Sequence, residues 1–251
     1  MAATGETSTG GADAARSAAD VRAALAALKA KRGYLLPHHG LLAVAAPALL
    51  AAYDATYTEL TLKPRAMAER DKEIVWLIIL VSTGEAIATH HIDRLRKAGG
   101  GDPDVAAALA LAAWAAGAER FTFVAAHWGP HLAGFDAVAG YRRGLDALLA
   151  AHPVDRAVAE IGLAAAHQCH RRWFFVKEHI RGAYRAGAGE RALAEGLSLA
   201  MFPGGVPNFV DACGHWKDLI LAGEVDATAP FRAWAEISGQ GGFDEAAGLA
   251  G

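Results

Sequence analysis

The sequence predicts an all-α fold built from two tandem copies of one helical unit. Apolar residues recur at helical spacing through nearly the whole chain, which is 53% hydrophobic and rich in Ala and Leu, with few β-branched runs. Gly and Pro interrupt these segments, as expected where helices end. The third observation is an internal repeat. At 251 residues the chain can bury a substantial core, and its hydrophobic fraction excludes a disordered protein.

The two ends of the chain are predicted to be loosely structured. Residues 1–12 are mainly Gly, Thr and Ala, and the segment from Ser238 onward is similar in character. Residues from about 13 to 32 form a predicted leading helix, which ends in Lys and Arg followed by Gly33. Residues 1–32 are therefore treated as a tail and leading helix that precede the repeats.

Two strongly apolar segments are predicted to be buried helices. Residues 74–81 are the only candidate strand, but they continue the lead-in AMAERDKE without a turn, so we expect a helix buried on all sides. Residues 105–118 follow Asp102-Pro103, an N-cap with Pro at the first helical position. Both apolar runs are shorter than the ~20 residues that a bilayer requires, so no membrane span is expected.

The internal repeat has an offset of 88 residues. The segment HIDRLRKAG that starts at His91 matches HIRGAYRAG at His179, and both copies end in His-Trp. The matching pairs are Tyr53 and Tyr141, His91 and His179, Gly99 and Gly187, Leu111 and Leu199, Gly117 and Gly205, Phe121 and Phe209, His127 and His215, and Trp128 and Trp216. We predict a first repeat at 33–128, a second at 129–222 that forms an internal pseudo-dimer with it, and a C-terminal extension at 223–251.

Each repeat contains a Glu, a buried helix, a break and a second helix that carries His. The step from Glu160 to His179 is 19 residues, that from Glu73 to His91 is one shorter, and each His is followed by Gly eight residues on. This frame resembles the carboxymuconolactone decarboxylase family, whose relatives include the alkylhydroperoxidase D-like proteins. The family pattern is Glu, eleven residues, Cys-x-x-Cys, three residues, His, and then Gly. The resemblance implies an all-helical fold and homo-oligomers.

Both copies depart from this pattern because they lack the Cys-x-x-Cys. Counted back from the histidines, the cysteine positions hold Gly84 and Ile87 in the first repeat, and Arg172 and Phe175 in the second. A peroxidase of this family needs one thiolate to attack the peroxide and a second thiol to resolve the product. We therefore expect no disulfide-cycling peroxidase. The resemblance points instead to the decarboxylase branch, in which a carboxylate and a His occupy this region.

The chemistry expected of such a site is proton transfer. Decarboxylation leaves a carbanion or enolate, and a carboxylic acid or imidazole near an apolar wall can protonate it. The predicted catalytic residues are Glu73, Glu85, His90 and His91, all in the first repeat. Glu85 and one of the histidines act as acid and base, and Glu73 orients the His. We expect Glu85 to face the histidines one to two helical turns further on.

Substrate binding is assigned to cationic and aromatic side chains. Arg binds a carboxylate in bidentate fashion, which favours Arg94 and Arg172, and His127 and Trp173 complete the predicted binding set. The substrate is expected to be a small carboxylated, ring-derived acid that undergoes decarboxylation or isomerisation. Structural roles stay open: a carboxylate also stabilises a helix N-terminus, and the paired His127 and His215 are typical of packing or capping.

Two other functions are compatible with the sequence. The first is a metal-dependent oxygenase or hydrolase with Fe, Mn or Zn, although a cofactor-free reaction is favoured. Its metal ligands would come from one of two sets, either Glu85, His90 and His91 or His167, His170 and His179. The second is a non-catalytic assembly protein.

The surface of the protein is expected to bind further copies of the chain. A helix without a polar face, such as residues 74–81, must be covered on all sides, so we predict a dimer, trimer or higher homo-oligomer. The formal net charge of −3 gives no footprint for nucleic acid or for an anionic membrane. The N-terminus lacks the pattern of a secretory signal, so a cytoplasmic location is expected.

Overall fold

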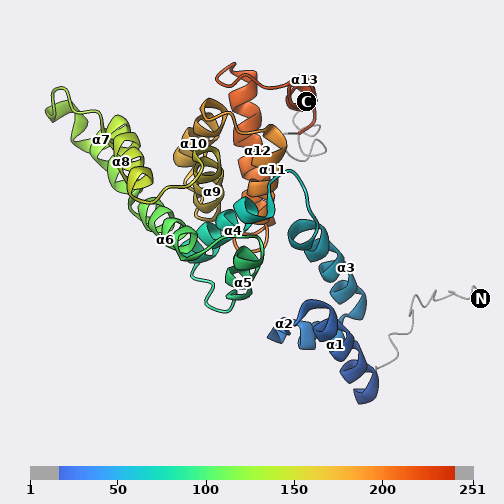
Figure 1. The fold of residues 1–251 in the computed structure, drawn as a ribbon. Coiled ribbons are helices and arrows are strands. Elements are labelled where there is room, and N and C mark those ends of the chain that lie inside the picture. Colours follow the sequence, from blue (N-terminus) through green and yellow to red (C-terminus); the bar gives the residue numbers. More distant parts are fainter. Residues whose placement is uncertain (1–16, 241–251) are drawn as a thin grey trace, which may run out of the picture. The chain divides into compact units, whose positions relative to one another are not determined.

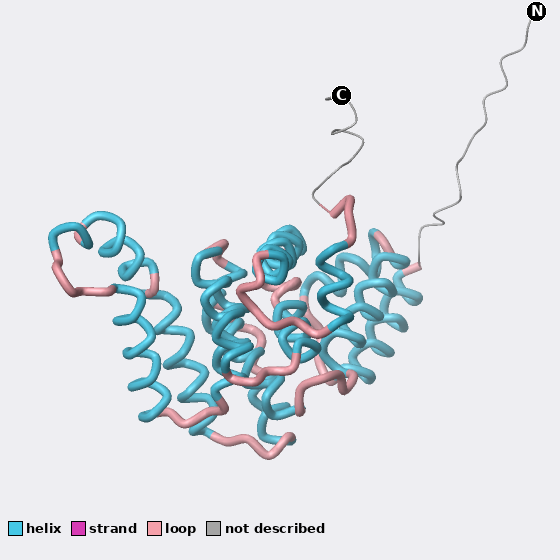
Figure 2. The backbone as a smooth tube through the Cα atoms, turned by 90° about the horizontal axis from the view of Figure 1, so that it is seen from above, coloured by secondary structure: helices cyan, strands magenta, loops and turns pink. Residues whose placement is uncertain are grey.

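The computed structural model describes residues 17–240, and within that range it contains helices and no strand (Figures 1 and 2). The predicted all-α class is therefore confirmed. The predicted tail at 1–12, the start of the predicted leading helix and residues 241–251 lie outside the described range. The chain divides into two compact units, residues 1–63 and residues 64–251.

The first unit is a small helical bundle. Its helices are α1 (Ala18–Arg32), α2 (Pro37–Ala45) and α3 (Pro47–Tyr57), followed by a π-helical turn, η1 (Thr58–Leu62). α1 begins at a capping box formed by Ser17 and Asp20, and ends at Gly33, whose φ of 85° favours glycine. The core of this unit contains one buried residue from each helix, Leu28, Ala43 and Leu50.

The second unit carries most of both repeats. Its elements are α4 (Glu69–Thr83), α5 (His90–Lys97), α6 (Asp102–Gly117), α7 (Glu119–His127), η2 (Gly129–His131), α8 (Ala137–Ala151), α9 (Arg156–Cys169), α10 (Trp173–Arg185), α11 (Glu190–Leu199), α12 (Val206–Leu221) and α13 (Ala229–Glu236). The order α4 to α7 recurs as α9 to α12, and α11 begins 88 residues after α6. The repeated sequence therefore corresponds to a repeated order of helices.

Helices α4 and α9 form the centre of the second unit. They are equivalent helices of the two repeats, and they pack against each other (Figure 1). α4 is buried from Lys72 to Leu80 and α9 from Val158 to Gln168, as predicted for helices without a polar face, although Val81 at the end of α4 is exposed. Gly162 makes the close approach possible, because a Cβ at that position would overlap Ile78 Cδ1.

The division into compact units does not follow the predicted repeat boundaries. The boundary at Lys63 lies inside the predicted first repeat, 33–128, and leaves α3 in the first unit. The sequence counterpart of α3 is α8, since Tyr53 matches Tyr141 at the repeat offset, and α8 packs against α6 and α7 in the second unit. The leading helix of the first repeat thus belongs to the first unit, and that of the second repeat to the second unit.

One helical stretch, Asp102–His127, is long and apolar enough to cross a membrane by length and composition. It combines α6 with α7, and only a third of its most apolar window is buried. However, α6 packs against α4 and α9, and its residues Ala107, Ala108 and Leu111 are fully buried there. A core helix passes the same length and composition test, which makes this stretch weak evidence for a membrane span.

Close helix packing in the second unit can be tested at Gly196 of α11. A Cβ at this position would overlap Cγ2 of Ile161 on α9, and a β-branched side chain has little freedom to rotate away. We expect Gly196→Ala to lower the free energy of unfolding by about 1–3 kcal/mol, measured by urea denaturation.

Gly214→Ala on α12 is the matched control. A Cβ at Gly214 has no heavy atom within 4 Å, and Ala favours a helix over Gly by up to ~1 kcal/mol. This variant should be as stable as the unmodified protein or slightly more stable. Equal losses of stability in both variants would contradict the close approach of α9 and α11.

Candidate active site

A buried carboxylate, Glu73, is the centre of the first repeat's candidate site. It lies in the second turn of α4, and only 1% of its surface is exposed. Its Oε2 accepts a hydrogen bond from Nδ1 of His91 on α5 at 2.6 Å, and its Oε1 accepts one from Nε of Arg94 at 2.6 Å. His91 and Arg94 are three residues apart, so α5 presents both to the same carboxylate.

The partners of Glu73 keep its carboxylate ionised. Burial by itself would raise the pKa of Glu73, but the hydrogen bonds and charges of His91 and Arg94 outweigh burial and lower that pKa below its ordinary value. Because Glu73 accepts from Nδ1–H, the other ring nitrogen of His91 carries a lone pair when the ring is neutral and a proton when it is charged.

That second nitrogen, His91 Nε2, has no hydrogen-bond partner among residues 64–240, the described part of the second unit. The ring packs against Trp76, with centroids 4.7 Å apart, and against His90, at 4.4 Å. The buried indole nitrogen of Trp76 also lacks a hydrogen-bond acceptor in the described residues. Arg94 is 23% exposed at its side chain, which places solvent next to this group. The site therefore has an oriented and buried imidazole, 2% exposed, whose second nitrogen makes no hydrogen bond within the second unit.

The second repeat contains the equivalent Glu–His pair, which we call closed because the second nitrogen of its histidine is hydrogen-bonded within the protein. Glu160 on α9 bonds to Nδ1 of His179 on α10 at 2.6 Å, and both residues are buried. Here the hydroxyl of Tyr141 on α8 lies 2.7 Å from Nε2 of His179, so it occupies the position that is free in the first repeat. The rings of His167 and His179 are stacked 5.3 Å apart, and Phe175 stacks on His167 at 4.9 Å.

The charge of Glu160 is balanced differently from that of Glu73. Arg142 from α8 and Arg156 from α9 both bind its oxygens, at 3.0 and 2.8 Å. Burial would raise the pKa of Glu160, but its bond to His179 and the nearby guanidinium of Arg142 lower that pKa to about 2. Burial also dominates at His179, whose pKa is lowered, so a neutral imidazole relays a hydrogen bond from Tyr141 to an ionised Glu160.

The structure does not place Glu85 where the sequence predicted it. We expected Glu85 on the helix of the histidines and facing them, but it lies in the turn between α4 and α5 and is exposed. The reason is that α4 ends at Gly84, whose φ of 72° reverses the chain, and α5 begins only at His90. Glu85 lines a separate apolar hollow of about 360 Å³ with Thr89 and Ile92, and the His91 ring is not part of its lining.

The other predicted binding residues are dispersed. Arg172 donates to the carbonyl of Ala115 at 2.8 Å, Trp173 packs against His215, and His127 is an exposed residue that packs against Phe123. No hydrogen bond, ion pair or ring contact connects Arg172, Trp173 or His127 with Glu73 or His91. Of the predicted set, the structure brings together Glu73, His90, His91 and Arg94.

Neither predicted set of metal ligands forms a cluster of at least three such side chains within residues 17–240. In the first set Glu85 lies in its own hollow. In the second set His170 Nε2 bonds to the carbonyl of Ser82 at 2.9 Å, while His167 stacks on His179.

Sequence reasoning missed Trp76, Tyr141 and the two arginines that bind Glu160. Tyr141 did give a signal, since it is one of the residues repeated at the 88-residue offset, but its repetition indicated only a fold position. Arg142 gave none, because its counterpart in the first repeat is Asp54, which pairs with Lys31 and Arg32. Contacts of this kind depend on which helix lies next to which.

The buried Glu160 predicts a specific dependence of stability on pH. A carboxylate with a lowered pKa in the folded state stabilises the fold at any pH above its ordinary pKa of 4.5. That stabilisation is lost as the pH falls from about 4.5 toward 2. We expect Glu160→Gln to lower the free energy of unfolding at pH 7 by about 3–5 kcal/mol, because it leaves buried charges unpaired, and to flatten the acid side of the curve.

Urea denaturation between pH 7 and pH 3 measures both effects. Glu119→Gln is the matched control, because that side chain is 60% exposed in its contact with Arg172. It should change stability by less than about 0.5 kcal/mol. A Glu160→Gln variant with wild-type stability at pH 7 would contradict the buried ion-pair network.

Comparison with known proteins agrees with the repeated frame. The model of the carboxymuconolactone decarboxylase family matches this chain twice, at residues 47–128 and 134–218. No curated protein and no solved structure matches it. The two matched segments cover most of the chain, and each contains one buried Glu–His pair. The chain therefore belongs to the carboxymuconolactone decarboxylase family, as a member with two tandem repeats.

Proposed function

We propose that this protein is an enzyme of the decarboxylase type that transfers a proton to or from a small carboxylated, ring-derived acid. The reaction is a decarboxylation or an isomerisation at the first repeat. Glu73 orients His91, His91 acts as acid or base through Nε2, and Arg94 binds a substrate carboxylate beside them. Family membership supports this class of activity in general. The choice of site rests on the geometry of the two Glu–His pairs.

The observation that carries the proposal is the free Nε2 of His91. The same nitrogen of His179 is bonded to Tyr141, so a substrate could use it only by breaking that hydrogen bond. A general acid or base must come within hydrogen-bond distance of the atom it protonates, so of the two described Glu–His pairs we choose that of the first repeat. The unpartnered indole N–H of Trp76 beside the ring adds a donor for a substrate oxygen.

The groups of the site account for the electron pair and the proton of the proposed reaction. In a decarboxylation the C–C bond to the carboxylate breaks, CO2 leaves, and its electron pair forms an enolate. Protonated His91 then delivers its Nε2 proton to that carbon, while ionised Glu73 stabilises the imidazolium. Arg94 donates its Nε to Glu73 at 2.6 Å, and its guanidinium therefore places a positive charge beside the imidazole of His91, where a substrate carboxylate would bind.

Thiol chemistry is not part of the proposal. Gly84, at one of the two cysteine positions of the first repeat, has a φ of 72°, a conformation that a Cys side chain rarely adopts. Burial raises the pKa of Cys169 to about 12 and that of Cys213 to about 11, which disfavours the thiolate that attacks a peroxide. We propose a cofactor-free reaction. A stoichiometric transition metal in protein purified without chelator would contradict that part of the proposal.

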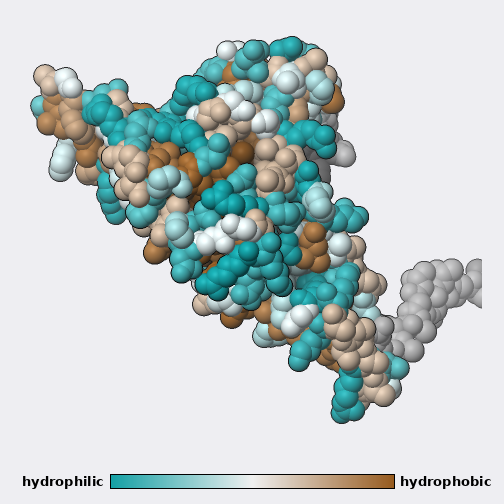
Figure 3. Space-filling view, in the orientation of Figure 1, coloured by the Kyte–Doolittle hydropathy of each residue, from teal (hydrophilic) through white to brown (hydrophobic). Residues whose placement is uncertain are grey.

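Self-association belongs to the proposal as well. Several large apolar side chains are exposed on α12 and at the start of α10, including Val206, Val210 and Phe174. Figure 3 shows apolar residues in separate patches among the hydrophilic ones on the face in view. Such patches are typical of surfaces that pack against a further copy. A monomer in light scattering would contradict the proposed homo-oligomer.

His91→Gln tests the proposed acid or base. CO2 release from carboxymuconolactone and related lactone carboxylates is the measurement, and loss of a general acid should lower kcat by about 10²–10⁴-fold. His179→Gln is the matched control, since that residue has the same Glu partner in the closed repeat. It should lower stability and leave kcat of the folded protein within about twofold.

Two outcomes would reject this site. Equal kcat in His91→Gln and the unmodified protein would exclude His91 as the catalytic acid or base. Loss of turnover in Glu85→Gln alone would show that the catalytic acid is Glu85, in the hollow that it lines with Ile92. Circular dichroism and thermal melting of each variant separate a loss of chemistry from a loss of folding.

A further inference from the structure

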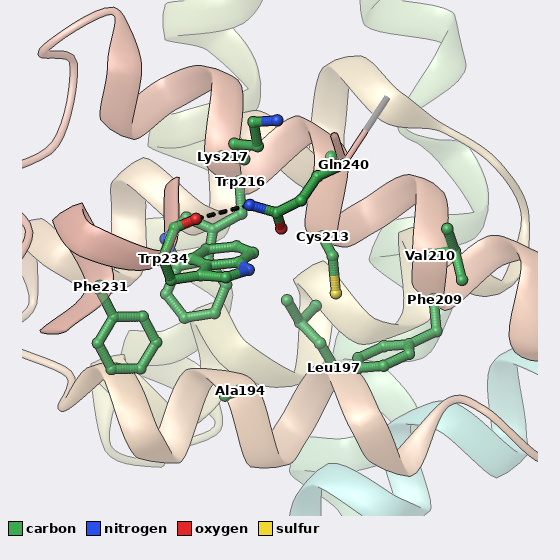
Figure 4. A pocket seen from close by; sticks show the side chains of 11 residues that line it. Ala194, Leu197, Phe209, Val210, Cys213, Trp216, Lys217, Phe231, Trp234 and Gln240 are labelled. Carbon is green, nitrogen blue, oxygen red and sulfur yellow. Dashed lines mark hydrogen bonds between the residues drawn. The ribbon is translucent and has the colours of Figure 1, made fainter. Parts of the chain in front are cut away.

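A second cavity of the molecule is unrelated to the Glu–His pairs. It has a volume of about 340 Å³ and lies between α11, α12 and α13 (Figure 4). This volume is within the ~300–1,000 Å³ of small-molecule sites in proteins. Phe231, Trp234 and Gln240 contribute to its lining and lie beyond residue 218, where the family match ends. The cavity is therefore a feature that the C-terminal extension adds to the second repeat.

Aromatic rings form one side of this cavity. The ring of Trp216 stacks on Phe231 with centroids 5.2 Å apart, and meets Trp234 edge-on at 5.6 Å. Leu197 and Phe209 close the opposite side in Figure 4, and the Sγ of Cys213 points toward the same space. Flat aromatic faces and aliphatic groups together favour a flat apolar ligand, whose burial removes apolar surface from water.

One cation lies at the edge of this apolar space. Lys217 lines the cavity and is partly exposed, and within residues 17–240 it has no ion-pair partner. Its neighbour in sequence, Asp218, is used by Lys177, at 3.6 Å. Among the described residues that line the cavity there is no Asp or Glu. Within residues 17–240, an anionic group on the ligand would therefore meet the ammonium of Lys217 and no opposing carboxylate.

Gln240 adds a hydrogen-bonding group next to Lys217. Its amide nitrogen donates to the carbonyls of Trp234 and Ile237, at 2.7 and 2.9 Å, which fixes the side chain in place. In Figure 4 its amide oxygen is turned toward the cavity, where it can accept a hydrogen bond from a ring hydroxyl. A fixed acceptor beside a free cation favours a ligand with both an anionic group and an apolar ring.

We propose that this cavity binds an aryl carboxylate, with the ring between Trp216, Trp234 and Leu197 and the carboxylate on Lys217. The site is a binding site without chemistry of its own, and it does not depend on the proposed reaction at His91. The aromatic walls account for the ring, and Lys217 accounts for the preference for an anion over a neutral ligand of the same shape.

Equilibrium dialysis with 2-naphthoate and its neutral amide, 2-naphthamide, tests the proposal. We expect saturable binding of 2-naphthoate with one molecule per chain. Lys217→Gln should weaken 2-naphthoate about tenfold, the usual scale for one charge-assisted contact, and change 2-naphthamide by less than twofold. Ala194→Phe, which fills the cavity from α11, should abolish binding of both. Lys29→Gln, an exposed lysine of α1, should change neither.

Three results would overturn this site. They are no saturable binding of 2-naphthoate, binding that survives in a folded Ala194→Phe variant, and equal weakening of acid and amide by Lys217→Gln. His91→Gln separates this proposal from the proposed reaction, because the variant should lose turnover and bind 2-naphthoate with unchanged affinity. Thermal melting of each variant shows that the binding result refers to folded protein.

Discussion

The arrangement of the second unit depends on burying one carboxylate in each of its two central helices. Glu73 and Glu160 lie in the long buried stretches of α4 and α9, where an unpaired charge would cost several kcal/mol. Each carboxylate is therefore enclosed by an imidazole and at least one guanidinium. These partners determine where the histidine-bearing helices α5 and α10 can lie, and so they connect the core with the candidate chemistry.

The two repeats satisfy this requirement with different arginines, and the difference separates their roles. In the first repeat the guanidinium comes from Arg94, on the same helix as the histidine. In the second repeat the corresponding position is Gly182, where a Cβ would overlap the Glu160 carboxylate, and Arg142 approaches from α8 instead. Helix α8 also supplies Tyr141, which occupies the second nitrogen of His179. In the second repeat the contact with α8 therefore uses the nitrogen of His179 that would otherwise face a substrate.

The cavity of the C-terminal extension has the opposite character to the Glu–His pairs. Its described lining is mainly aromatic and aliphatic, and its lysine, Lys217, has no ion-pair partner within residues 17–240. Its aromatic side comes partly from α13, which follows the second repeat. In each Glu–His pair the carboxylate is also bound by at least one guanidinium, which balances its charge. A site built from satisfied charges suits proton transfer, whereas an apolar space with one free charge suits binding of an amphipathic ligand.

The sequence alone determined the helical class, the doubled unit and the pairing of Glu73 with His91. These depend on local periodicity and on spacing along the chain, both of which a sequence records directly. It also placed the buried helix at 74–81, apart from its exposed last residue. The tertiary structure decided the rest. Glu85 lies outside the site because Gly84 ends α4 and reverses the chain. The Nε2 of His179 is hydrogen-bonded to Tyr141 of α8, 38 residues earlier in the chain. Whether the Nε2 of such a histidine makes a hydrogen bond depends on which distant helix packs against it. The spacing of residues within one helix does not predict that contact.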